Sequence, residues 1–176
     1  MLGAAGALCC LAGGTALGSW VRTRRTERLH LLQAEIEALH MMRLLLEQER
    51  PALPELLEAC AGAAPYGDGA GAFAKRLRLT AQRLREQPFE TSGQAYAFAC
   101  SQIDVPWEKA DEKTAVETLF AQIGAGPAAM REQAAAVCIR RLKPLAQKAQ
   151  QEAEKAGKLC IQLGMLFGLM AGIILW

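Results

Sequence analysis

Apolar residues recur at helical spacing through most of the chain. In residues 29–46 they step by three and four positions, the period of one face of a helix. These positions are Leu29, Leu32, Ile36, Leu39, Met42 and Leu46. Pro51 follows and is expected to end this helix. No stretch of residues 22–158 shows sustained alternation with the β-branched residues that strands favour, so the pattern predicts an all-α protein.

Further helices follow from the same spacing and from local start and stop signals. Thr91 and Gln94 stand at the spacing of a capping box, which opens a helix. Pro127 can occupy the first turn of the last helix, and Pro144 is the one kink site expected within it. The expected ranges are 55–61, 73–84, 93–103, 116–123 and a last helix from Pro127 to the end.

The helix expected from Pro127 onward has a long apolar face. The segment over residues 62–71 has the composition of a loop. The inner positions expected for the last helix are Met130, Ala134, Val137, Leu142, Leu145, Ala149, Ala153 and Ala156. Residues 62–71 read GAAPYGDGAG, which is typical of a flexible connector. The middle of the chain is therefore predicted to form a compact bundle of about six helices.

Both ends of the chain are free of charge. All 20 Lys and Arg and all 18 Asp and Glu lie within residues 22–158. As helices, residues 1–21 would extend about 32 Å and residues 159–176 about 27 Å, against a hydrocarbon core of roughly 30 Å. We therefore expect an N-terminal transmembrane helix over 1–21, a cytosolic helical domain over 22–158 and a C-terminal transmembrane helix over 159–176.

Two other interpretations of these ends stay open. A secretory signal peptide would carry its positive charges before the apolar run, whereas here they follow it. The C-terminal segment could instead be a buried core helix, although such a helix usually carries charge on one side. The membrane interpretation is the preferred one.

Basic residues next to both apolar ends predict the orientation in the membrane. Lys and Arg near a span favour the cytosolic side, so both termini are expected across the membrane from the helical domain. The topology-setting charges are Arg22, Arg24, Arg25, Arg28, Lys148, Lys155 and Lys158.

Glycines are spaced four apart in the second apolar end. Such a stripe lets another helix backbone approach closely. Candidate packing positions in the two spans are Gly6, Gly14, Gly18, Gly164, Gly168 and Gly172. The spans are expected to pack on each other or on a partner. The alternative is that the glycines reflect only the usual composition of membrane helices.

Residues that carry chemistry do not converge in this sequence. His30 and His40 lie about 15 Å apart along one helix, too far to share a metal ion. The six cysteines form no C-x-x-C pair, and Cys60, Cys100 and Cys138 fall on apolar helix faces, where they are expected as small core residues. We expect no catalytic residues, no metal site and no cofactor.

The charged residues predict no nucleic acid partner. The formal net charge is only +2, whereas nucleic acid binding needs a clustered basic surface. Two acidic pairs, Glu35 with Glu37 and Asp111 with Glu112, are interpreted as exposed helix faces. The basic run between residues 75 and 85 is interpreted as a solvated face, or as a contact for anionic lipid or an acidic partner. Its members are Lys75, Arg76, Arg78, Arg83 and Arg85.

Several short motifs, in order along the whole chain, resemble the stage III sporulation protein AB family. The first are RTER at residues 25–28, LQAEIEAL at 32–39, PAL at 51–53 and ACA at 59–61. Later ones are LFAQIG at 119–124, LG at 163–164 and FGL at 167–169. The resemblance rests on this layout between two apolar ends, because each motif alone is short.

The resemblance implies a role in endospore formation. Members are similar to the cytosolic helical domains of the F-component platform protein of type II secretion. The resemblance further implies that the protein is a non-enzymatic platform subunit of a channel between mother cell and forespore. This subunit would lie in the mother-cell membrane that surrounds the forespore. Implied partners are the lipid bilayer, the other membrane and ring components of the channel, and a secretion-type ATPase of the same operon.

The leading hypothesis is therefore a membrane scaffold that couples this ATPase to the channel. A membrane-bound enzyme or carrier would need an ionisable residue inside a span or a converging catalytic set, and the sequence offers neither. A generic membrane-anchored scaffold in signalling or cell division is the alternative, and homo-oligomerisation is left open. The candidate partner surface is Glu47, Glu49, Arg50, Pro51 and Leu53.

Overall fold

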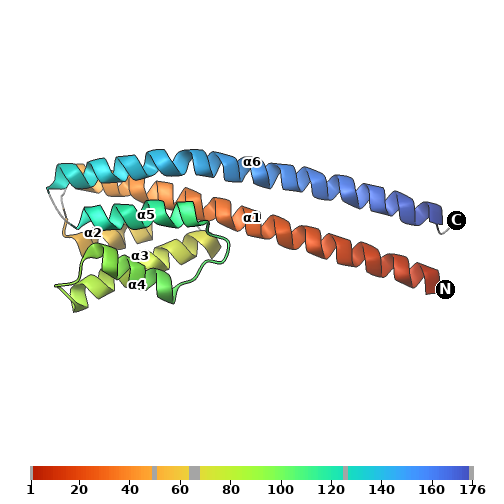
Figure 1. The fold of residues 1–176 in the computed structure, drawn as a ribbon, viewed down its shortest axis with the longest axis horizontal. Coiled ribbons are helices and arrows are strands. Elements are labelled where there is room, and N and C mark those ends of the chain that lie inside the picture. Colours follow the sequence, from red (N-terminus) through yellow and green to blue (C-terminus); the bar gives the residue numbers. More distant parts are fainter. Residues whose placement is uncertain (1, 49–50, 64–67, 125–126, 175–176) are drawn as a thin grey trace. The chain divides into compact units, whose positions relative to one another are not determined.

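The computed structural model describes the backbone of residues 2–48, 51–63, 68–124 and 127–174. It describes side chains over 23–48, 51–63, 70–124, 127 and 129–155. Six helices and no strand lie in these ranges (Figure 1). They are α1 Leu2–Gln48, α2 Leu53–Gly62, α3 Asp68–Glu86, α4 Ser92–Gln102, α5 Ala110–Ile123 and α6 Ala128–Ile174. The all-α prediction is confirmed for the described chain.

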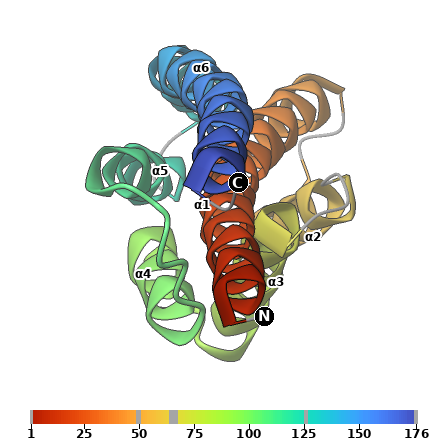
Figure 2. The ribbon, with the colours of Figure 1, turned by 90° about the vertical axis from the view of Figure 1, so that its right-hand side faces the viewer.

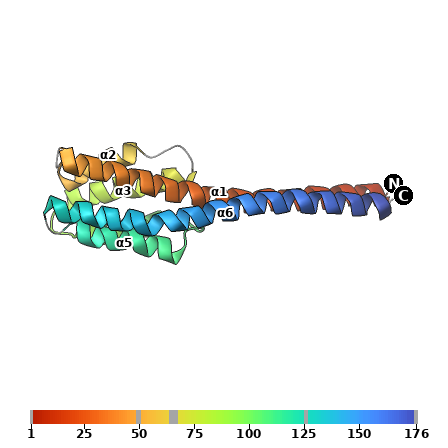
Figure 3. The same cartoon turned by 90° about the horizontal axis from the view of Figure 1, so that it is seen from above.

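The helices are divided between two compact units. One comprises Met1–Thr26 and Lys148–Trp176, and the other Glu27–Gln147. In the first unit, the stretches of α1 and α6 run alongside each other, with the start of α1 and the end of α6 on the same side (Figures 1 and 3). Arg25 Nη1 donates a hydrogen bond to the backbone carbonyl of Glu152 at 3.0 Å, so a side chain of α1 holds the backbone of α6 within this unit.

The predicted transmembrane helices fall on stretches whose side chains lie outside the described residues. The backbone is helical over residues 2–21 and 159–174. In the part of the chain that the structure describes, no helix combines the length and the apolar character needed to cross a membrane. The spans over 1–21 and 159–176 stay predictions, and so do the domain boundaries drawn from them.

The second unit is a bundle in which the chain reverses direction at each connection. Consecutive helices run in opposite directions: α1, α3 and α5 run one way along the bundle, and α2, α4 and α6 run the other way (Figure 1). Viewed along the helices, α2, α3, α4 and α5 follow one another around the bundle in chain order (Figure 2). This order agrees with the packing of α2 on α3, α3 on α4 and α4 on α5.

The core of the bundle is built from the predicted apolar faces. On α1, Leu32, Leu39, Met42 and Leu46 are buried. The rings of Tyr96 on α4 and Phe120 on α5 stack in parallel with centroids 4.0 Å apart. Further buried side chains come from α2, α3 and α6, among them Leu56, Leu57, Phe73, Leu77, Ile139 and Leu142. Burial of this apolar surface is the main force that holds the helices together.

Local signals placed several helix ends correctly. Thr91 is the N-cap of α4, and its hydroxyl accepts a hydrogen bond from the backbone N–H of Gln94. The side-chain oxygen of Gln94 accepts one from the backbone N–H of Thr91, as the predicted capping box requires. Pro54 lies in the first turn of α2. Helix α5 ends at Ile123, the end of the expected range 116–123, and Gly124 directly follows it. Pro144 lies inside α6 without ending it.

Other sequence expectations were wrong. Helix α3 begins at Asp68, so the connector predicted over 62–71 is helical at its end. Met130 was expected on the inner face of α6 but is 60% exposed, because the inward stripe of α6 in this bundle begins at Ala134 and Ala135.

Candidate functional site

The bundle contains a cluster of ionisable side chains that are closed off from solvent. Its members are Arg28, Glu35, Arg76, Glu108 and Glu112, and we refer to them as the buried ionic cluster. They come from α1, α3, the segment between α4 and α5, and α5. Charged side chains rarely lie this deep unless they are paired, because removing them from water is costly.

Arg28 and Glu112 form the first pair, between α1 and α5. Arg28 Nε donates to Glu112 Oε1 at 2.9 Å, and Arg28 Nη2 donates to the same oxygen. The side chains are 8% and 0% exposed. The second oxygen, Oε2, accepts from the backbone N–H of Lys109 at 3.1 Å. Glu112 therefore caps the start of α5 and ties α5 to α1 with one carboxylate.

Arg76 and Glu108 form the second pair, between α3 and the segment before α5. Arg76 Nη1 lies 3.0 Å from Glu108 Oε1, and Nη2 lies 2.8 Å from Oε2, which is bidentate geometry. Arg76 Nε also donates to the carbonyl of Ile103 at 3.1 Å. Burial is the largest single effect on Arg76 and lowers its pKa, but the hydrogen bonds to Glu108, together with charge interactions with Glu108, Tyr96 and Cys100, outweigh it, and the pKa is raised. The guanidinium thus stays charged and holds the α4–α5 connection against α3.

Glu35 is the member of the cluster without a pair. It lies on α1, is 0% exposed, and neither carboxylate oxygen has a hydrogen-bond partner. Burial raises the pKa of this carboxyl well above its usual value, and the nearby carboxylates of Glu108 and Glu112 raise it further, against a smaller opposing effect of Arg76. The neutral acid is therefore the favoured form in the folded bundle.

The interpretation of the acidic pairs and the basic run as exposed faces was wrong for their key members. Glu35, Arg76 and Glu112 are buried. In the same run, Arg83 pairs with Glu90 at 2.8 Å and Arg85 pairs with Glu58. A sequence signal for the buried members did exist, because they lie on the apolar faces of their helices. Glu35 follows Leu32 by three positions, Arg76 follows Phe73 by three, and Glu112 precedes Val116 by four.

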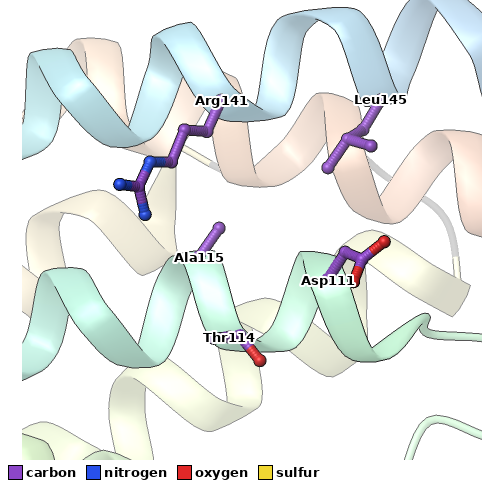
Figure 4. A pocket seen from close by; sticks show the side chains of 5 residues that line it. All are labelled: Asp111, Thr114, Ala115, Arg141 and Leu145. Carbon is purple, nitrogen blue, oxygen red and sulfur yellow. The ribbon is translucent and has the colours of Figure 1, made fainter.

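A shallow groove lies on the surface between α5 and α6. It has a volume of about 340 Å³ and is lined by Asp111, Thr114, Ala115, Arg141 and Leu145. Figure 4 shows Arg141 and Leu145 reaching in from α6, with Asp111 and Thr114 on α5 opposite; the carboxylate of Asp111 and the guanidinium of Arg141 lie toward opposite ends. The groove is thus lined by one acidic and one basic side chain.

The described cysteines behave as core residues, as expected. Cys60, Cys100 and Cys138 are free and buried. Burial raises the pKa of Cys60 and of Cys138 to about 12, so these thiols are poor nucleophiles at neutral pH. Among the described side chains, no three His, Cys, Asp or Glu residues come together in a way that could hold a metal ion.

The predicted topology-setting charges occupy different environments. Arg24, Arg25, Lys148 and Lys155 are exposed. Arg28 instead belongs to the buried ionic cluster. The side chains of Arg22 and Lys158 lie outside the described residues, as do those of the packing glycines Gly6, Gly14, Gly18, Gly164, Gly168 and Gly172. Helix packing through these glycines stays a prediction.

The candidate partner surface lies where α1 is followed by α2. Glu47 is exposed, and Pro51 and Leu53 are half-buried. Glu49 and Arg50 lie outside the described residues. No contact in the structure tests whether this surface meets a partner, so the assignment stays a prediction.

Comparison with known protein families matches residues 3–176 to stage III sporulation protein AB. The chain belongs to the stage III sporulation protein AB family. The match covers nearly the whole chain, so both units described above are part of the family's common sequence. Comparison with curated proteins and with solved structures found no significant match to either. Membership in this family implies that the protein acts at a stage of sporulation. It also confirms the family resemblance that was noted from the sequence motifs.

Proposed function

We propose that this member of the family is a non-enzymatic platform subunit of a secretion-like channel between mother cell and forespore. It would be anchored by residues 1–21 and 159–176 in the mother-cell membrane around the forespore, with the helical domain in the cytosol and both termini across the membrane. Its task would be to couple a cytosolic secretion-type ATPase to the channel. Family membership and three features of the chain support this proposal.

The sorting of charge supports a membrane anchor. Every Lys, Arg, Asp and Glu lies within residues 22–158. Exposed basic residues flank the charge-free ends, with Arg24 and Arg25 on one side and Lys155 on the other. Such an arrangement favours insertion of the ends, with the middle of the chain on the cytosolic side.

The observation that carries the proposal is that α1 and α6 each contribute to both units. Each is a single helix of 47 residues. In the bundle, they are joined by the pair of Arg43 with Glu132 at 3.0 Å, and Arg28 fixes α1 to α5. A platform subunit needs its cytosolic part attached to its anchors by ordered structure, because flexible linkers dissipate displacement. Continuous helices are suited to that task.

The use of the charged side chains is consistent with a scaffold. In the buried ionic cluster, Arg28 joins α1 to α5, and Arg76 joins α3 to the segment before α5, so both pairs hold the bundle together. The surfaces proposed for partners are the exposed groove with Asp111 and Arg141, and the surface of Glu47, Glu49, Arg50, Pro51 and Leu53. The first would face another channel component and the second the ATPase.

Membrane topology is tested by cysteine labelling of the full chain. Glu37 is exposed on α1, so Glu37→Cys should react with a membrane-impermeant maleimide only after the cells are permeabilised. The unmodified chain is the control, because its described cysteines are buried. Labelling of Glu37→Cys in intact cells, or recovery of the chain in the soluble fraction, would contradict the proposed anchoring.

Coupling to the ATPase is tested by charge reversal in sporulating cells. Glu47→Arg and Arg50→Glu should reduce recovery of the ATPase in a pull-down with the full chain. The control is Lys75→Glu, which reverses an exposed charge on α3. Unchanged recovery would remove this surface from the proposal. Crosslinking to division or signalling proteins, with no ATPase among the products, would instead favour the generic scaffold.

A further inference from the structure

Glu35 differs from every other carboxylate of the buried ionic cluster. Glu108 and Glu112 each bond to an arginine, through contacts of 2.8 Å and 2.9 Å. Glu35 is equally deep, with 0% of its surface exposed, yet both of its oxygens lack a partner. Two cations face three carboxyl groups, so one carboxyl has no counter-charge when all are ionised.

The titratable groups that act on Glu35 come from α3, α4, the segment before α5, α5 and α6. Arg28 lies on α1 itself and is bonded to Glu112. Electrostatic neighbours from the other elements are Arg76 on α3, Tyr96 on α4, Glu108 before α5, Glu112 on α5 and Cys138 on α6. Cys100 on α4 is a further buried titratable group beside Tyr96. Among the described residues, Arg76 is the cation that acts on Glu35, and it is already bonded to Glu108.

We propose that Glu35 is a proton-binding site that couples the seating of α1 in the bundle to the uptake of one proton. With the proton bound, the cluster has two positive and two negative charges and is neutral. Without it, an ionised carboxylate would be buried with no hydrogen bond, next to two other carboxylates. The bundle would relieve this by moving the side of α1 that carries Glu35 toward water.

The direction of the pH effect follows from the location of the proton. The raised pKa of Glu35 means that the folded bundle binds the proton more tightly than the unfolded chain does. When the pH rises above the ordinary glutamate value of about 4.3, the unfolded chain loses this proton and the folded bundle keeps it. Glu35 therefore makes the protein less stable as the pH rises. The unfolding constant increases by up to tenfold per pH unit until the folded bundle also releases the proton.

The test compares urea unfolding of the full-length wild type with Glu35→Gln, followed by circular dichroism at several values between about pH 5 and pH 8. Glutamine has nearly the same shape and cannot ionise. We expect the ratio of the wild-type to the variant unfolding constant to rise with pH by up to tenfold per unit. Glu37→Gln is the matched control: Glu37 lies on the same helix but is exposed, and its curve should parallel that of the wild type.

A second measurement needs no variant to fold. Infrared difference spectra of the wild type labelled with carbon-13 glutamate should show a protonated glutamic acid in the folded protein at neutral pH. Parallel pH curves for the wild type and Glu35→Gln would overturn the proposal. An infrared spectrum with every glutamate ionised at neutral pH would overturn it as well, and would point to a bound cation or water at Glu35.

Discussion

Arg28 and Glu112 lie 84 positions apart in the sequence, and their side chains bond at 2.9 Å inside the bundle. The same Glu112 carboxylate accepts the backbone N–H of Lys109 at the start of α5. One side chain therefore both starts a helix and attaches it to the first helix of the chain.

The Arg28–Glu112 pair predicts a large loss of stability when only one partner is removed. Arg28→Met leaves the Glu112 carboxylate buried without its cation, which should lower the free energy of unfolding by about 3–5 kcal/mol. The double substitution Arg28→Met with Glu112→Leu should recover much of this loss, because it removes both buried charges. Urea unfolding of the full chain, followed by circular dichroism, measures both effects.

The control for the Arg28–Glu112 pair is an exposed ion pair on α5. Lys113 and Glu117 are 3.9 Å apart with both side chains more than a third exposed, so Lys113→Met should change stability by less than about 1 kcal/mol. A similar small effect for Arg28→Met would mean that the buried pair does not hold α1 to α5.

Gly124 predicts a steric effect at the contact between α4 and α5. A Cβ at this position would lie 2.3 Å from the Ser92 hydroxyl oxygen, which itself donates to the carbonyl of Phe120 at 2.6 Å. Gly124→Ala should therefore cost about 1–3 kcal/mol, because the helices must separate or the hydroxyl must leave its bond. Calorimetric melting of the full chain measures the change.

The matched control for Gly124 is Gly71 on α3. A Cβ at Gly71 meets nothing within 4 Å, and alanine suits a helix interior better than glycine does. Gly71→Ala should stabilise the protein by about 0.5–1 kcal/mol. If both alanine variants stabilise the protein, the close approach of α4 and α5 at Gly124 is not maintained in solution.

Cys60 and Cys138 should resist alkylation while the protein is folded. Burial raises the pKa of each thiol from 9.0 to about 12, which lowers the reactive thiolate fraction at pH 8 by roughly a thousandfold. Mass spectrometry after iodoacetamide treatment should find both unmodified in buffer and modified in urea. The introduced thiol of Glu37→Cys is the exposed reference, and equal rates at Cys60 and this reference would contradict the burial.

Thr91 predicts a modest loss when the cap of α4 is removed. Thr91→Ala removes the acceptor for the Gln94 backbone N–H and should cost about 1 kcal/mol. Thr118→Ala is the control, because its hydroxyl bonds only to the carbonyl of Thr114 in its own helix and the substitution should change stability by no more than about 0.5 kcal/mol. Both changes can be read from urea midpoints, and equal midpoints would show that the cap does not stabilise α4.

The helices could be predicted from the sequence because their signals are local. The spacing of Leu32, Leu39 and Met42 lies within one helix, and Thr91 and Gln94 are three positions apart. The start of α3 was misplaced because the glycines at 67, 69 and 71 favour a loop by local propensity, whereas packing of the following apolar face extends the helix back to Asp68.

The buried ionic cluster could not be read in the same way, because its contacts are distant in sequence. Arg76 bonds to Glu108 across 32 positions, and charge alternation along one helix does not reveal such a partner. A charged residue on an apolar face, such as Glu35 three positions after Leu32, is the sign that sequence reasoning can use. That sign identifies the residue but leaves its partners open.

The separation of Arg28 from Glu112 has a consequence for the nascent chain. A ribosome adds about 5–20 residues per second, so roughly 4–17 s pass between the synthesis of the arginine and that of the acid it needs. During this interval α1 has neither its buried partner on α5 nor Glu132 on α6. The bundle therefore cannot close around Arg28 until the chain has been made as far as α5.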